Sequence, residues 1–310
     1  VLKHNTIERT IMNNPDGTEQ QDKKPHLSYS GISTFTRCPM QFKFRYVDGL
    51  KRAPAGVQMT IGTAVHKGAE ATLKHKIQSG ELLTAEDQQD ATRDALIDAW
   101  DGDEEKDIDP VELTPEEKAV GNAKTKDKAI DVAVSLSDLH AKELAPTIQP
   151  HTVEEKFRLE IEGAKYDLLG YLDVTEKLAV MDEYGAHRAD VLKLRDLKTK
   201  GKSPSKGEAD ETLQFSIYAL AMFTLHGRLP DTIVMDCLVK TKTPKLVQQH
   251  TTRTKPQMVQ LLQRIRITLE AIEKGVFPPT DPTNWWCGDK WCGYWSECPF
   301  GGGAALPVHG

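Results

Sequence analysis

The spacing of apolar residues changes along the chain. Up to about residue 145 they recur every three or four positions, which is the period of an amphipathic helix. From residue 151 they alternate with polar residues, which is the period of a β-strand, and helical spacing returns twice towards the C-terminus. The predicted elements are a helix over 32–46, a helix over 59–77, helices within 84–145, a hairpin of strands 153–161 and 166–175, a strand over 191–199, a helix over 209–226, a strand over 232–240 and a helix over 256–274. Their order predicts an α/β protein.

Several segments lie outside this core pattern. Residues 1–26 are polar without hydrophobic periodicity and predict a flexible N-terminal arm, and the Gly-rich residues 301–310 predict a flexible tail. Residues 78–150 predict a helical insertion, interrupted by an acidic loop at 101–110, with no chemistry of its own. The expected domain therefore covers residues 27–300.

Composition limits where such a protein works. A chain of 310 residues can bury a substantial core. Its longest apolar run, 218–225, is far shorter than the ~20 residues that cross a bilayer. The first residues lack the apolar stretch of roughly 7–15 residues that a secretory signal needs. We therefore expect no membrane association and a cytoplasmic location, in the host cytoplasm if the protein is phage-encoded.

The net charge of −6 conceals an uneven distribution. Residues 81–118 hold fifteen acidic and three basic side chains, a local charge of −12 that leaves the remainder of the chain at +6. The acidic average therefore does not exclude a polyanionic partner.

Two carboxylates and a lysine are the first candidate chemistry. Asp196 and Lys198 stand two positions apart on a predicted strand, so their side chains project from one face. Asp173 follows Leu172 in a strand whose neighbours are apolar, and a buried carboxylate needs a partner. Carboxylates with Mg²⁺ and one lysine are a minimal set for phosphodiester hydrolysis. Taken alone, however, an Asp-x-Lys pair is more often a surface ion pair.

The order of four motifs resembles the PD-(D/E)XK nuclease superfamily, and more narrowly its RecB-type exonucleases. The motifs are a histidine, Gly-x-x-Asp, Asp-x-Lys and Gln-x-x-x-Tyr, at His66, Asp173, Asp196 with Lys198, and Gln214 with Tyr218. Leu27-Ser28-Tyr29-Ser30, Cys38-Pro39-Met40-Gln41-Phe42, Gly62-Thr63-Ala64-Val65-His66 and Val239-Lys240-Thr241 are also similar to that family. The resemblance covers residues 27–300 except 78–150, and the family's Pro-Asp pair reads Leu172-Asp173 here.

The resemblance implies a restriction-endonuclease-like core, in which helices flank a mixed central sheet. It further implies that Mg²⁺ or Mn²⁺ is bound by His66, Asp173, Asp196 and the Leu197 carbonyl, that Lys198 orients the water or stabilises developing charge, and that Gln214 and Tyr218 support the site. A lone histidine on an apolar helix face is usually structural, so the role of His66 depends on the other motifs. Glu155 is a candidate for an additional carboxylate and Glu154 faces the opposite way, and we expect both to be solvated.

The C-terminal cysteines are the second candidate site. Cys287, Cys292 and Cys298 lie in a segment rich in tryptophan, and Cys38 supplies a fourth thiol that would tie the first helix to the C-terminus. We expect ligation in place of free core thiols, while Cys237 is expected to fill the core. The residues leave Zn²⁺ and an iron–sulfur cluster open. The resemblance to AddB-type nucleases and their CRISPR-associated relatives implies a 4Fe–4S cluster, although several relatives have two residues in place of four between the first two of these cysteines.

The resulting expectation is a metal-dependent DNA exonuclease that acts on single-stranded DNA or DNA ends during recombination, repair or phage DNA processing. A recombination or helicase protein is an expected partner. The alternatives are a noncatalytic iron–sulfur subunit that binds single-stranded DNA and an iron–sulfur redox protein. The complete Asp173, Asp196 and Lys198 set argues against the first alternative, and the second is disfavoured because no electron-partner or flavin motif accompanies the cysteines.

Overall fold

The computed structural model describes residues 24–50, 56–102 and 109–301. In chain order the elements are β1 (His26–Leu27), α2 (Tyr29–Arg37), α3 (Pro39–Phe42), the π-helix η1 (Lys43–Val47), α4 (Val57–Ser79), α5 (Ala85–Asp101), α6 (Pro115–Val120), α7 (Asn122–Leu139), the π-helix η2 (His140–Leu144), the 3₁₀-helix η3 (Ala145–Thr147), β2 (Thr152–Leu159), β3 (Asp167–Met181), β4 (His187–Lys200), α8 (Glu208–Glu211), α9 (Leu213–His226), β5 (Thr232–Val239), β6 (Lys245–Thr251) and α10 (Lys255–Glu273).

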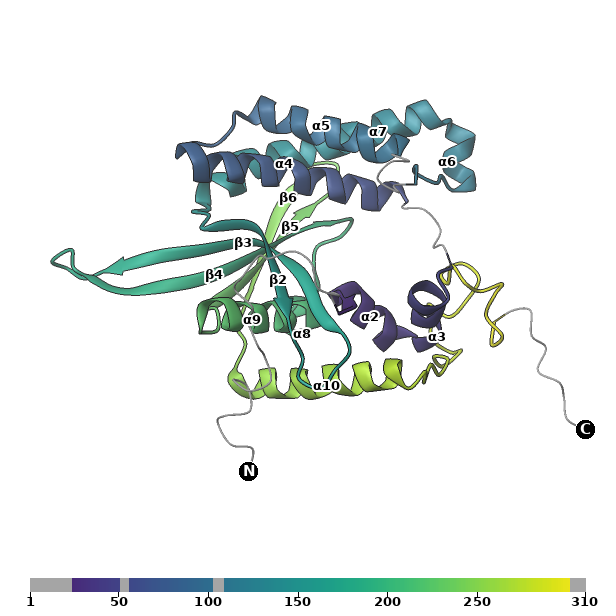
Figure 1. The fold of residues 1–310 in the computed structure, drawn as a ribbon. Helices are drawn as coiled ribbons and strands as arrows, with labels where there is room; N and C mark the ends of the chain where they lie inside the picture. Colours follow the sequence, from purple (N-terminus) through teal and green to yellow (C-terminus); the bar gives the residue numbers. More distant parts are fainter. Residues whose placement is uncertain (1–23, 51–55, 103–108, 302–310) are drawn as a thin grey trace, which may run out of the picture.

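Six strands form one mixed sheet in the order β1-β3-β4-β5-β6, and β2 pairs with β3 beside this path. The pairs β1–β3 and β4–β5 are parallel, and the pairs β2–β3, β3–β4 and β5–β6 are antiparallel. Helices α4, α5 and α7 cover one face, and α9 and α10 lie on the other (Figure 1). The structure thus confirms the expected mixed sheet flanked by helices.

Two apolar cores hold these layers together, one on each face of the sheet. Phe215 and Leu220 of α9 pack with Leu262 and Ile265 of α10 in the first core, and Leu172 of β3 joins them. The second core lies between the sheet and the helices α4, α5 and α7. No helix among the described residues is long and apolar enough to cross a membrane.

The sheet divides at the middle of β3. Strands β3 and β4 are paired from Met181 and His187 back to Val174 and Arg195. Beyond Val174, β3 continues with β2 and β1, whereas β4 continues with β5. The next residues after the last β3–β4 pair are therefore free to project into the opening between the two branches.

Most elements lie where the spacing predicted them, but the first helix does not run through Cys38. The predicted helix 32–46 is broken there, because Cys38 has φ −157° and ψ 105° between α2 and α3. The ring of Pro39 disfavours the helical conformation of the residue before it. Residues 24–26, which we expected in the arm, also belong to the fold, since His26 pairs with Asp167. Residues 1–23 and 302–310 lie outside the described residues.

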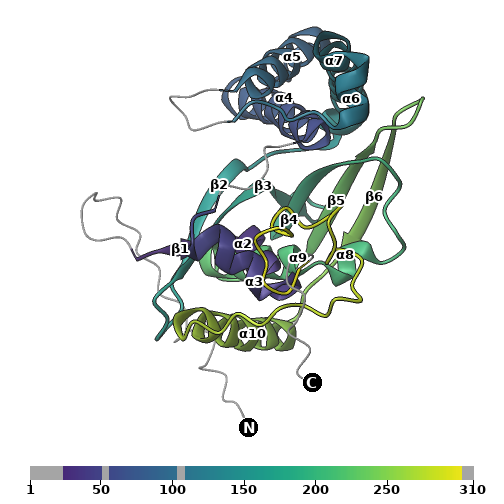
Figure 2. The same ribbon diagram turned by 90° about the vertical axis from the view of Figure 1, so that its right-hand side faces the viewer.

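The segment predicted as a helical insertion forms α5, α6, α7, η2 and η3, and α5 and α7 pack against α4 (Figure 2). A buried polar group joins two of them, because Gln88 Nε2 on α5 donates to the Ser137 carbonyl on α7 at 3.1 Å and lies 3.0 Å from Nδ1 of His140. Part of the predicted acidic loop, residues 103–108, lies outside the described residues.

Candidate active site

The division of the sheet places two carboxylates close together, on neighbouring strands. Val174 of β3 and Arg195 of β4 form the last β3–β4 pair; Asp173 immediately precedes Val174, and Asp196 immediately follows Arg195. At this point the Leu197 amide donates a hydrogen bond to Asp173 Oδ2 at 3.0 Å. The carboxylate thus takes up a backbone donor where the β3–β4 pairing has ended.

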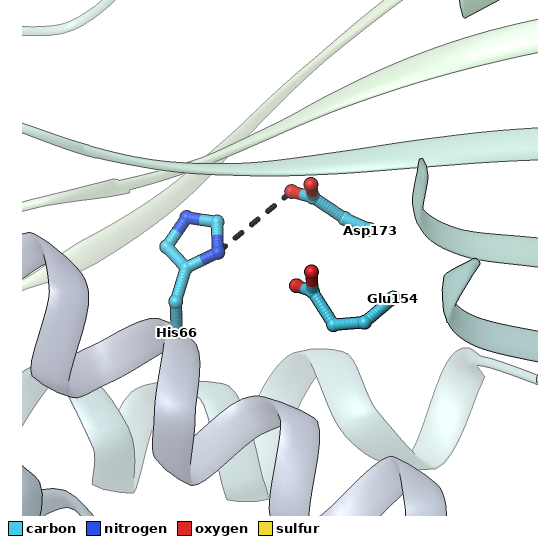
Figure 3. A group of neighbouring side chains, drawn as sticks. All are labelled: His66, Glu154 and Asp173. Carbon is cyan, nitrogen blue, oxygen red and sulfur yellow. Dashed lines mark ion pairs between the residues drawn. The ribbon is translucent and has the colours of Figure 1, made fainter. Parts of the chain in front are cut away.

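His66 and Glu154 complete a cluster around Asp173. One ligand atom from each of the three residues lies within 4.8 Å of the others, and the side chains converge from α4, β2 and β3 (Figure 3). His66 Nδ1 is 3.8 Å from Asp173 Oδ2. Glu154 has φ 54°, the left-handed region that a non-glycine residue rarely occupies within a strand.

This placement corrects the expectation for the two glutamates. Glu154, which we expected to be solvated, joins the cluster, whereas Glu155 accepts a hydrogen bond from Thr152 and lies 3.7 Å from Nε2 of His226. Strict alternation along β2 assigned the faces in the opposite sense. The positive φ of Glu154 breaks that alternation, and no residue in the sequence signals it.

Asp196 is fully buried and connects to three of the other predicted residues. Its Oδ1 accepts hydrogen bonds from Lys198 Nζ at 2.9 Å and from Gln214 Nε2 at 3.3 Å. Gln214 Nε2 also donates to the Tyr218 hydroxyl at 2.7 Å. Gln214 and Tyr218 of α9 therefore support Asp196, and no hydrogen bond between Gln214 and Lys198 is found in the described part of the chain.

Electrostatics set the protonation of the two aspartates. Burial raises the pKa of Asp196 to about 7, with Lys198 opposing the shift and Asp173 adding to it. Burial likewise raises the pKa of Asp173 to about 6, against the effect of Lys198. Two close, desolvated carboxylates resist ionising together unless a cation compensates them.

The two basic groups of the site, His66 and Lys198, differ in their protonation state. Burial and the charge of Lys198 lower the pKa of His66, while a hydrogen bond with the Leu197 backbone is among the effects that oppose the shift. Burial lowers the pKa of Lys198, but Asp196 and Asp173 outweigh it, so the pKa is raised. Near neutral pH, His66 is therefore a neutral imidazole that can act as a ligand, and Lys198 is a cation.

The donor set fits a divalent cation. Asp173 and Glu154 offer carboxylate oxygens and His66 offers a ring nitrogen. Asp196 Oδ2 is buried and accepts no hydrogen bond from the described residues, although Lys198 Nζ is 2.8 Å away. Carboxylate oxygens suit Mg²⁺ and Mn²⁺, and the uncompensated negative charge favours binding. The predicted Leu197 carbonyl adjoins this group, since its residue contacts both His66 and Asp173.

An open cleft of about 910 Å³ leads to this cluster. His66, Glu154 and Lys198 line it together with Lys67 and Gln58 of α4. The site is therefore accessible to a substrate larger than water, and basic side chains lie along the approach.

Cys38 and the three C-terminal cysteines form a group that is separate from the cleft. Cys38, Cys292 and Cys298 pack against the same small apolar cluster, which is formed by Met40, Phe44 and Tyr294. All five cysteines of the chain are free of disulfides.

Cys287 belongs with the other three thiols. Burial raises the pKa of Cys287, and the charges of Cys38, Cys292 and Cys298 raise it further. Within the described ranges, no three of these sulfurs lie within 4.8 Å of one another. Cys237 is fully buried in the main core, as expected.

Comparison with known protein families agrees with the chemistry of the cleft. The sequence profile of the PD-(D/E)XK nuclease superfamily matches residues 26–299. The chain therefore belongs to this superfamily and is a nuclease, a class whose members use divalent metal ions. Its mixed sheet between helices is the restriction-endonuclease-like core that the resemblance implied.

Two solved structures are distantly similar. A crystal structure from Eubacterium rectale, described as that of a candidate exonuclease, has a TM-score of 0.49 and 10% identity, and the match covers 87% of this chain and 93% of that one. The protein named SSO0001 has a TM-score of 0.37 and 9% identity, over 91% and 88% of the two chains. Comparison with curated proteins found no match.

Proposed function

We propose that the protein is a Mg²⁺- or Mn²⁺-dependent DNA exonuclease of the RecB-type branch. One observation carries the proposal: His66, Glu154 and Asp173 converge beside the Asp196–Lys198 pair at the end of an open cleft. Asp173, Asp196, His66 and Glu154 would hold the cation, with the Leu197 carbonyl beside them. When bound, the cation would supply Lewis-acid stabilisation of the phosphoryl oxygens and a more acidic water.

The side chains would divide the remaining work. The Lys198 ammonium would orient the attacking water or stabilise negative charge on the phosphoryl group, a role that its raised pKa favours. Gln214 would keep Asp196 in place through its hydrogen bond, and Tyr218 would fix the Gln214 amide. A neutral His66 would leave a ring nitrogen free to act as a ligand.

A cleavage assay with end-labelled DNA tests this function. We expect hydrolysis with Mg²⁺ or Mn²⁺, none with EDTA, and none in Asp173→Ala, Asp196→Ala or Lys198→Ala protein that retains its circular dichroism spectrum. An active Asp196→Ala protein would overturn the mechanism. DNA binding without cleavage by the wild type would favour the alternative, a noncatalytic subunit that holds single-stranded DNA.

We further propose that cleavage starts at a DNA end, on single-stranded DNA or at duplex ends, during recombination, repair or phage DNA processing in the cytoplasm. A recombination or helicase protein would be the partner. The decisive substrates are linear and circular single-stranded DNA of equal length. An exonuclease degrades only the linear form, and rapid cutting of the circle would make the protein an endonuclease.

For the four thiols we propose a 4Fe–4S cluster. A single tetrahedral Zn²⁺ would hold thiolates about 3.8 Å apart, given Zn–S bonds of about 2.3 Å. Within the described residues no three of the sulfurs of Cys38, Cys287, Cys292 and Cys298 lie within 4.8 Å of one another, and a 4Fe–4S cluster holds its thiolates farther apart than a single zinc ion does. The irregular spacing of these cysteines along the chain also occurs in iron–sulfur sites.

A further inference from the structure

One lysine in the cleft differs from the others in its partner. Lys198 is paired with Asp196, and Lys67 donates to Glu70 at 2.8 Å. Lys240, which directly follows β5, donates to the neutral amide oxygen of Gln58 at the start of α4. No carboxylate forms an ion pair with Lys240 within the described ranges.

Because Lys240 is partly buried, the lack of an acidic partner destabilises its charged form. Its side chain is half-buried, and burial lowers the pKa of its ammonium without an opposing effect from any acidic group. A partly desolvated cation without an anionic partner is destabilising unless an anion binds to it. Because Lys240 also lines the cleft that contains His66 and Lys198, the anion would come from the molecule that occupies this cleft.

A second hollow continues the cleft beyond Lys240. It measures about 390 Å³ and shares Gln58 and Lys240 with the cleft, so the two adjoin at this pair. Asp131 and Ser135 of α7 form one wall, and Lys242 in the β5–β6 loop lies on the other side. The cleft at the metal-ligand cluster and the hollow beside the helical insertion therefore meet at Lys240 and Gln58, and the two together are called the groove below.

We propose that this groove carries the DNA strand being cut, with the Lys240 ammonium bound to a backbone phosphate outside the scissile linkage and with α7 of the insertion as a wall of the path. The inference rests on the proposed nuclease function and adds a positioning role for a segment in which we expected no chemistry. Lysine binds phosphate as a point charge, so this contact is independent of base sequence.

Charges of both signs line the groove, and their removal should have opposite effects on DNA binding. Lys242 adds a second cation beyond Lys240, whereas Asp131 is exposed in the same hollow and would repel a phosphate. Removing the lysine charge should therefore weaken binding, and removing the aspartate charge should strengthen it. A folding defect would not produce tighter binding. Removing the Asp131 charge therefore distinguishes an electrostatic effect from a loss of binding caused by misfolding.

The experiment measures the binding of fluorescent oligothymidylates of 4 to 20 nucleotides by anisotropy, in EDTA to prevent cleavage and at several salt concentrations. For Lys240→Gln we expect weaker binding of the longer oligonucleotides and a salt slope smaller by about 0.7, the value for one phosphate contact on a single strand. Lys240→Arg should restore most of the affinity. Asp131→Asn should bind the same longer oligonucleotides more tightly than the wild type.

Lys274→Gln is the matched control, since it removes one exposed lysine charge from the end of α10 and should bind as the wild type does. If Lys240→Gln and Asp131→Asn both bind every oligonucleotide with wild-type affinity and salt slope, the groove is not the path of the strand. That result would leave the nuclease function standing as long as the wild type cleaves DNA with Mg²⁺. A wild type that neither binds nor cleaves DNA would refute the proposed function and the groove together.

Discussion

Glu154 shows how one backbone angle decides the composition of a site. Its φ of 54° turns the carboxylate towards His66 and Asp173, while the neighbouring Glu155 points to Thr152 and His226. Such a conformation costs of order 1–3 kcal/mol, and strained residues of this kind cluster at functional sites. We infer that the strain is retained because it supplies a ligand.

We therefore expect Glu154→Gln to raise the metal concentration for half-maximal nuclease activity by at least tenfold, since even the outer-shell partners of a metal site contribute roughly 10–100-fold to affinity. The measurement is a Mg²⁺ and Mn²⁺ titration of cleavage. Glu155→Gln is the matched control and should leave the titration unchanged. If the two variants respond alike, Glu154 is not a ligand.

A buried histidine predicts how stability depends on pH. His140 is 1% exposed, and burial, with a smaller effect of His66, lowers its pKa from 6.5 to about 4. The unfolded chain takes up this proton near pH 6.5, whereas the folded protein does not until about pH 4. The unfolded state thus binds more protons in this window, and stability falls as the pH drops, by about 3 kcal/mol in total at ~1.36 kcal/mol per unit.

Urea unfolding between pH 7.5 and pH 4.5 measures this effect. His140→Gln removes the ionisation and should flatten the dependence, whereas His151→Gln, which alters an exposed histidine, should not. An unchanged pH dependence in His140→Gln would assign the loss of stability to other groups.

At the scale of elements, a buried ionic network joins the strands beside the point where the sheet divides. The Arg195 guanidinium donates to Glu176 on β3 at 2.6 Å and to Asp236 on β5 at 3.0 Å. All three side chains are buried, and they connect strands β3, β4 and β5 next to Asp196. The network therefore holds β3, β4 and β5 together next to the point where the sheet divides.

Removing one partner should be far more costly than breaking an exposed ion pair. Arg195→Met leaves the buried Asp236 without its cation and leaves Glu176 with only Lys193, 3.5 Å away, so we expect a loss of about 3–5 kcal/mol in the free energy of unfolding. Lys177→Met breaks the exposed pair with Asp190 and should cost far less. Denaturant unfolding of both variants tests the difference, and equal losses would mean that the network contributes no more than a surface pair.

The elements themselves were largely predictable because each depends on local periodicity. The helix predicted over 59–77 is α4, and the hairpin of 153–161 with 166–175 is confirmed by the pairing of β2 with β3. The extent of β3 and β4 was not predictable. Beyond Glu176 they form an exposed two-stranded arm, in which Val180 and Met181 face solvent, so burial leaves no signal of where the strands end.

The candidate site was predictable only in part, for a related reason. Spacing places Asp196 and Lys198 on one face of a strand, and they are paired in the structure. The approach of His66 to Asp173 and the turn of Glu154 depend on how α4 crosses the divided sheet. Local periodicity carries no information about that packing.

At the scale of the whole molecule, the cysteine site would join segments from the two ends of the described chain. Cys38 lies at the break between α2 and α3, and the other three thiols follow α10. A cluster ligated by all four would close a very long loop, which removes conformational entropy from the unfolded chain. Metal ligation of this kind contributes directly to folding stability.

We expect protein purified without oxygen to be brown and to contain iron and sulfide, because the four thiolates would ligate the proposed 4Fe–4S cluster. Cys38→Ser should lose the iron and the visible absorption, and its Tm should fall by at least about 5 °C, the shift of roughly 2 kcal/mol for a chain of this size. Cys237→Ser is the control for ligation, since that thiol lies in the main core and the variant should keep its iron.

Colourless wild-type protein with one equivalent of zinc would contradict the cluster and make the site a structural zinc centre. Iron retained in Cys38→Ser would remove Cys38 from the ligand set and with it the link between the two ends.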